Sequence, residues 1–114
     1  MNKTIIILDD MLPFQVMTIV ALENLGYDVL TAETGAQAEK LLHSYTVDLL
    51  IIDDVLKRGT NEAEDFINRL PEKLAYGRIA EDPGKLRYDQ LGKFVWEKGD
   101  DLRKLIDEVK KVLD

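Results

Sequence analysis

Acidic side chains that follow two apolar runs are the residues best suited to chemistry. Asp9 and Asp10 come directly after one run, and Asp53 and Asp54 come directly after another. Carboxylates that lie close together repel one another, and each then favours its protonated form. A bound divalent cation removes this conflict, and Mg²⁺ takes hard oxygen ligands while keeping several waters. A carboxylate beside Mg²⁺ can attack a phosphoryl group, because the cation neutralises charge on the phosphoryl oxygens.

Aspartates after strands also serve as ordinary turn and cap residues. For Asp9 and Asp10 taken alone, this structural role is the simpler interpretation. A second aspartate pair after another strand favours a metal pocket, if the two strand ends are neighbours. The chain has no cysteine and a single histidine, His43. Thiolate and histidine clusters are therefore excluded, and oxygen atoms must be the main ligands of any metal.

Hydrophobic periodicity predicts the elements that position these aspartates. Runs of β-branched and aliphatic residues predict strands over 4–8, 27–32 and 47–52. Apolar residues at helical spacing predict helices after Asp10, after Thr34 and after Asn61. We expect Gly26 to end the first helix, a capping box at 34–37, and Asn61 to cap the third helix.

The second half of the chain is less regular, because Gly77 and Arg78 interrupt the apolar pattern of the next strand. The remaining predicted elements are a strand over 74–80, a turn at Pro83-Gly84, a short helix over 85–91, a strand over 93–97 and a final helix capped by Asp100. Strands that alternate with helices imply an α/β fold whose parallel sheet is covered on both faces. Ligands of such sheets bind at the carboxyl ends of the strands, which places Asp9 and Asp10 beside Asp53.

Length and charge narrow the classes of protein. The 114 residues fit one domain, 1–114, and the net charge of −7 argues against nucleic acid and anionic membranes as partners. The N-terminal apolar run is too short for a secretory signal or a membrane span. A cytoplasmic protein is therefore expected.

The first half of the chain resembles the receiver domains of response regulators, such as CheY, over residues 3–56. The matching segments are Ile5-Ile6-Ile7-Leu8-Asp9-Asp10, Gly26-Tyr27-Asp28-Val29-Leu30-Thr31-Ala32 with Gly35 and Ala38, and Asp48-Leu49-Leu50-Ile51-Ile52-Asp53. The resemblance implies a flavodoxin-like (CheY-like) three-layer sandwich with a five-stranded parallel sheet in the order 2-1-3-4-5. The fourth helix is expected to be shortened or irregular.

The resemblance also implies roles for individual residues. Asp53 would be the phosphoacceptor, and Mg²⁺ would be held by Asp9, Asp10, Asp53 and the backbone carbonyl of Val55. Strand alternation is expected to point Asp54 away from the side that Asp53 faces.

The second half departs from the receiver pattern. Receivers usually carry Thr or Ser at the end of the fourth strand, where this chain has Ala80 followed by Glu81. They also carry a Lys after the fifth strand; among Trp96, Glu97 and Lys98, Lys98 is the best candidate, with a shortened loop after it. The missing hydroxyl removes a charge-assisted bond worth about 1.5–3 kcal/mol. In receivers this hydroxyl bonds the phosphoryl oxygen when the domain switches, so the resemblance implies that this chain lacks that contact of the usual switch.

Three functional hypotheses follow. The first is a stand-alone receiver of a two-component phosphorelay, phosphorylated on Asp53 by a sensor histidine kinase or phosphotransfer protein and signalling by contact with a downstream protein. Such a domain takes part in its own modification, is no turnover enzyme, and is expected to be a monomer or weak dimer. The second is a receiver-like interaction module that does not switch by phosphorylation. The third is a Mg²⁺-dependent phosphohydrolase, disfavoured because its usual Asp-x-Asp pattern is absent.

Overall fold

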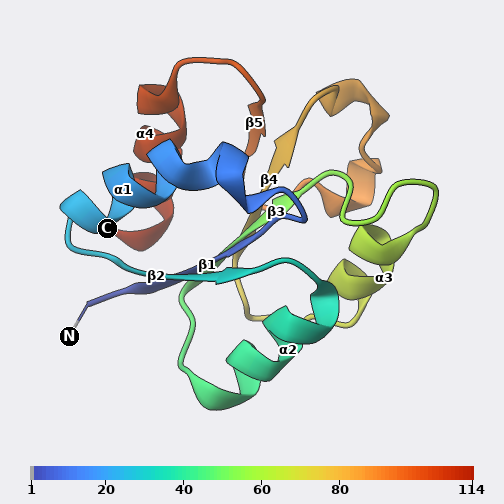
Figure 1. Ribbon diagram of the computed structural model, residues 1–114, viewed down its shortest axis with the longest axis horizontal. Helices are drawn as coiled ribbons and strands as arrows, with labels where there is room; N and C mark the ends of the chain where they lie inside the picture. Colours follow the sequence, from blue (N-terminus) through green and yellow to red (C-terminus); the bar gives the residue numbers. More distant parts are fainter. Residues whose placement is uncertain (1) are drawn as a thin grey trace.

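A computed structural model describes residues 2–114 and contains a parallel sheet in the order β2-β1-β3-β4-β5 (Figure 1). The strands are β1 (Thr4–Leu8), β2 (Asp28–Ala32), β3 (Leu49–Asp53), β4 (Tyr76–Ala80) and β5 (Val95–Glu97). The helices are α1 (Val16–Asn24), α2 (Gly35–Ser44), α3 (Glu62–Asn68) and α4 (Leu102–Leu113). Within residues 2–114, no helix is both long and apolar enough to cross a membrane.

Two hydrophobic clusters cover the faces of the sheet and fix its position. Helices α2 and α3 cover one face, and α1 and α4 cover the other (Figure 1). In β1, Ile6 and Leu8 face the α2–α3 side, whereas Ile5 and Ile7 face the α1–α4 side. Burial of one such side chain contributes about 1.5–3 kcal/mol. The central strands β1 and β3 are thus held from both sides, as their continuous apolar sequence predicts.

The predicted elements of the first half are confirmed, with small changes at the ends of helices and strands; β2 starts at Asp28, and β3 runs from Leu49 to Asp53. Gly26 follows α1 with a φ of 94°, and Thr34 Oγ1 accepts a hydrogen bond from the Gln37 amide at 3.1 Å. Asn61 precedes α3 but makes no side-chain cap. Instead, the Thr60 hydroxyl oxygen accepts a hydrogen bond from the amide of Glu62, the first residue of α3, at 3.3 Å.

Strand β4 is continuous through the two residues that interrupt its apolar pattern. Gly77 is required because a Cβ at this position would overlap the Phe94 ring, which packs on the α1–α4 face. Arg78 points to the opposite face and is only 1% exposed. Both residues therefore belong to the packed sheet, and neither ends the strand.

The prediction of a helix over 85–91 is wrong. This segment contains two short 3₁₀ turns, η2 (Pro83–Lys85) and η3 (Tyr88–Gln90), and no α-helix forms between β4 and β5. Tyr88 is 90% exposed, so the segment lacks the continuous apolar face that stabilises a helix on a sheet. The expectation of a shortened or irregular fourth helix is confirmed.

The final helix begins one residue later than predicted. Asp101, and not Asp100, is the N-cap of α4, and its carboxylate accepts a hydrogen bond from the Arg103 amide at 2.9 Å. Asp100 instead accepts a hydrogen bond from the Asp101 amide at 2.7 Å.

Candidate functional site

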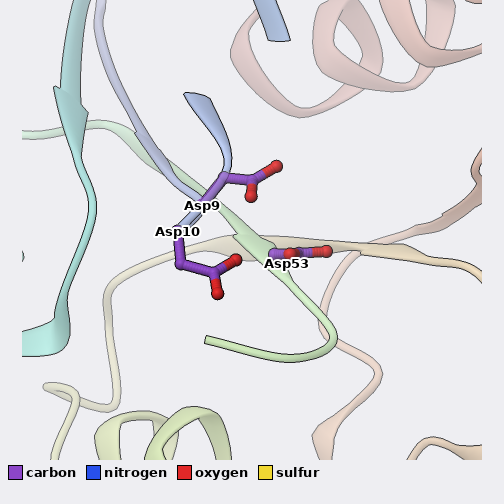
Figure 2. A group of neighbouring side chains, drawn as sticks. All are labelled: Asp9, Asp10 and Asp53. Carbon is purple, nitrogen blue, oxygen red and sulfur yellow. The ribbon is translucent and has the colours of Figure 1, made fainter. Parts of the chain in front are cut away.

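The three aspartates predicted to form a pocket lie together at the carboxyl ends of β1 and β3 (Figure 2). One carboxylate oxygen from each of Asp9, Asp10 and Asp53 lies within 4.8 Å of the others. The two strands are direct neighbours, with Leu8 in register with Ile52. Asp53, which lies far from Asp9 and Asp10 in the sequence, is therefore brought into one cluster with them, as predicted.

Asp9 is held by the short turn that follows β1. Its Oδ1 accepts a hydrogen bond from the Met11 amide at 2.8 Å, and its Oδ2 accepts one from Gln15 Nε2, also at 2.8 Å. Gln15 belongs to the 3₁₀ turn η1 (Leu12–Gln15) and is 4% exposed. The turn thus fixes the Asp9 carboxylate in a buried position, and no pattern in the sequence predicts the contact with Gln15.

Asp53 is the carboxylate most affected by its surroundings. It is 4% exposed, and its Oδ1 lies 2.7 Å from Lys98 Nζ. Burial raises the pKa of Asp53 to about 8, and the nearby charge of Asp9 adds to this effect, while Lys98 opposes it. Burial and the charge of Asp9 also raise the pKa of Asp10. Burial and like charge therefore disfavour the ionised forms of Asp53 and Asp10, even with Lys98 in place.

Lys98 reaches the cluster from the turn after β5. Its amide donates to the Ala80 carbonyl at 2.8 Å, so the backbone continues alongside β4 for one more residue. Gly99 then turns the chain with a φ of 89°, and α4 starts three residues later, at Leu102. This is the shortened loop that the sequence required if Lys98 was to be the lysine of the site. Burial disfavours its charged form, but contact with Asp53 outweighs this and raises the pKa of Lys98.

The prediction that Asp54 points away from the site is wrong. Its Oδ1 lies 3.4 Å from Lys98 Nζ, and its Oδ2 accepts a hydrogen bond from the Glu81 amide at 3.0 Å. Strand β3 ends at Asp53, so the alternation of a strand no longer governs the next residue. Burial would raise the pKa of Asp54, but hydrogen bonds outweigh burial and lower it.

An open cavity contains the acidic cluster and is also lined by Val55 and Lys98. Ala80, at the end of β4, is fully buried, so the position of the expected hydroxyl carries only a methyl group. Among the residues between β4 and β5, the cavity is lined by Glu81, Asp82, Lys85 and Leu86, none of which carries a hydroxyl. The hydroxyls that line the cavity, those of Thr18 and Thr60, come from α1 and from the loop before α3. The departure from the receiver pattern is therefore also found in the structure.

Comparison with known proteins gives partial sequence similarity and a close similarity of fold. No family model matches the chain. It is 41% identical over 63 residues to the phosphate regulon transcriptional regulatory protein PhoB of Pseudomonas aeruginosa, a match that covers 55% of this chain. The chain spans only 27% of the length of that protein.

Solved structures of response regulators superpose over nearly the whole chain. A CheY-like receiver domain from Methylobacillus flagellatus matches with a TM-score of 0.81 at 18% identity, covering 98% of this chain and 99% of that one. A response regulator from Thermotoga maritima matches with a TM-score of 0.80 at 20% identity, covering 99% and 98%. TrrA from Thermotoga maritima, solved in complex with Mg²⁺–BeF, matches with a TM-score of 0.78 at 23% identity, covering 96% and 98%. The chain thus has the fold of the CheY-like receiver domains of response regulators.

Proposed function

We propose that this chain is a receiver of a cytoplasmic two-component phosphorelay that accepts a phosphoryl group on Asp53 with Mg²⁺ and signals by protein contact. The observation that carries the proposal is the buried Asp53 carboxylate, which lies 2.7 Å from Lys98 Nζ and in one cluster with Asp9 and Asp10. The receiver fold and the partial similarity to PhoB support the same assignment.

The residues present fit Mg²⁺. The cluster offers only oxygen ligands, and burial together with the charge of Asp9 disfavours the ionised form of Asp53, a cost that a bound cation would offset. Asp9, Asp10, Asp53 and the backbone carbonyl of Val55 would hold the ion. When bound, Mg²⁺ supplies positive charge that offsets the charge of the carboxylates and of the phosphoryl oxygens.

The chemistry assigned to the chain itself is simple. An ionised Asp53 oxygen forms a bond to phosphorus while the bond from phosphorus to the imidazole nitrogen of a phosphohistidine donor breaks. The electron pair of the broken bond stays on that nitrogen. Lys98 is placed to pair with the charge that the modified Asp53 carries. The donor would be a sensor histidine kinase or a phosphotransfer protein, and the domain would not act as a turnover enzyme.

A second candidate is a receiver-like interaction module that does not switch by phosphorylation. Two observations favour it: the methyl group of Ala80 in place of the expected hydroxyl, and the absence of an α-helix between β4 and β5. The intact acidic cluster and the contact between Lys98 and Asp53 favour the first candidate, because an interaction module has no need of them.

Stabilisation by a phosphoryl mimic tests the proposal. Beryllofluoride with Mg²⁺ is expected to raise the unfolding temperature of the wild type, because a ligand that binds only the native state stabilises it. Asp53→Asn is expected to lose this rise, and Asp65→Asn, which changes an exposed aspartate of α3, is expected to keep it. An unchanged unfolding temperature of the wild type, or an equal rise in Asp53→Asn, would favour the interaction module instead.

A further inference from the structure

Arg78 is a charged side chain in the interior of the sheet that the proposed chemistry does not use. It is 1% exposed, and it lies on the face of β4 that also carries Tyr76, toward α2 and α3. None of the ion pairs within residues 2–114 includes Arg78. Burial lowers the pKa of its guanidinium. A buried charge without a counter-ion is costly, so its place in the core needs an explanation.

The guanidinium of Arg78 connects the acidic site to segment 83–92, which contains η2 and η3. Its Nη1 donates to the Gln90 carbonyl at 2.9 Å, and its Nη2 donates to the Asp53 carbonyl at 3.4 Å. Gln90 belongs to η3, and Asp53 is the last residue of β3. One rigid, planar group therefore joins the backbone of the proposed phosphoacceptor to the backbone of η3.

Gln90 extends this connection to α3. Its side chain is buried, and its Nε2 donates to Asn68 Oδ1 at 2.9 Å and to the Glu64 carbonyl at 3.2 Å. Within residues 2–114, the donor Arg78 Nε and the acceptor Gln90 Oε1 have no protein partner. The connection from Asp53 to α3 thus runs through Arg78 and the backbone carbonyl and side-chain amide of Gln90.

We propose that Arg78 is a positioning residue that couples occupation of the acidic pocket to the conformation of segment 83–92. The proposal rests on the function proposed above. A change in the backbone at Asp53 would reach the Gln90 carbonyl through the guanidinium and move η3, where the Tyr88 side chain is almost fully exposed. Arg78 would thus transmit the signal in a chain that has Ala80 where a hydroxyl is expected.

A second connection joins the site to the start of the same region. Asp54 accepts a hydrogen bond from the Glu81 amide and lies beside Lys98. A signal carried by Asp54 would act first on the chain before η2, whereas one carried by Arg78 acts on η3. Variants of Arg78 and Asp54 can therefore separate the two routes.

Amide hydrogen exchange measured with and without Mg²⁺ and beryllofluoride tests the coupling. In the wild type, occupation of the pocket is expected to change exchange in peptides that cover 83–92. In Arg78→Met this change is expected to be lost, while the rise in unfolding temperature with beryllofluoride remains. Arg69→Met, which removes an exposed arginine at the end of α3, serves as the matched control and should respond as the wild type does.

Arg78→Lys provides a second variant should Arg78→Met fail to fold. It keeps the positive charge and most of the aliphatic stem, but a lysine ammonium lacks the planar fork that spans both carbonyls. It is also expected to lose the change in 83–92.

The possible failures can be told apart. If the wild type binds beryllofluoride and segment 83–92 responds equally in both Arg78 variants, the coupling through Arg78 is wrong and the proposed function stands. A response of 83–92 that is lost in Asp54→Ala and kept in Arg78→Lys would also overturn the proposal, because the signal would then run through Glu81. A wild type that binds no beryllofluoride would overturn both the coupling and the proposed function.

Discussion

The half of the sheet formed by β1, β2 and β3 differs from the half formed by β4 and β5 in how its core is made. The first half is held by apolar side chains on both faces, with β1 and β3 buried along almost their whole length. The second half has a buried arginine in β4, a short β5 and two 3₁₀ turns between them. The strands that carry the acidic cluster are thus packed by apolar side chains, whereas the second half buries a charged side chain, and under the coupling proposed above the second half is the part that responds.

The largest expected difference concerns stability. Phe66 in α3 is fully buried in the cluster between α3 and the sheet. Phe66→Ala is expected to lower the free energy of unfolding by about 3–5 kcal/mol, because it leaves a cavity that the rigid surroundings cannot fill. Urea unfolding would measure this. A loss below about 1 kcal/mol would mean that the first half is less tightly packed than the structure indicates.

The pH dependence of stability is expected to come from the same half. Because the pKa of Asp53 is raised to about 8 in the folded protein, the folded state binds more protons than the unfolded state between about pH 4 and 8. The free energy of unfolding should therefore fall as pH rises through this window, by on the order of 3 kcal/mol between pH 5 and 8.

Asp53→Asn should remove most of this slope, since an amide does not titrate, and excess Mg²⁺ should flatten it in the wild type. Urea unfolding at several pH values would measure both effects. A slope that persists in Asp53→Asn would show that other groups cause it.

Lys98 lies where the two halves meet, so its removal sharpens the comparison. Lys98→Met is expected to slow phosphoryl uptake on the order of 100-fold, as is typical when one preorganised donor is lost from a charged site. The rate of mass gain with a small phosphodonor would be measured. Lys104→Met, which changes an exposed lysine on α4, is the matched control and should leave the rate unchanged. Equal rates in the two variants would show that Lys98 takes no part in phosphoryl uptake.

The smallest effect is expected on the surface of the second half. Tyr88 is 90% exposed, so Tyr88→Ala should change the free energy of unfolding by less than about 0.5 kcal/mol. A loss of more than about 1 kcal/mol in urea unfolding would show that the tyrosine packs against the rest of the domain.

The same division explains what the sequence predicted. The strands that precede Asp9 and Asp53 have continuous apolar sequences typical of buried parallel strands, and parallel connectivity then brings the two strand ends together. The acidic cluster could therefore be placed before the structure was known. Lys98 was identified from the resemblance to receivers, and its contact with Asp53 agrees with that choice.

The features that the sequence did not predict depend on contacts between distant residues. Arg78 breaks the apolar pattern of a strand, and only its bonds to Asp53 and Gln90 explain why it is buried there. Asp54 lies beside Lys98, against the predicted orientation, because β3 ends at Asp53 and strand alternation no longer sets the direction of the next side chain. The turn predicted at Pro83-Gly84 is confirmed as part of η2, whereas η3 lacks a continuous periodic pattern and local sequence does not separate it from a helix.

The most direct test of the central claim is the location of a covalently bound phosphoryl group. The protein would be incubated with a small phosphodonor, with and without Mg²⁺, and fragmented for mass spectrometry. The account predicts one phosphoryl group per chain, on Asp53, only when Mg²⁺ is present, and none in Asp53→Asn. An unmodified chain at every Mg²⁺ concentration, or a phosphoryl group on Asp54 in place of Asp53, would contradict it.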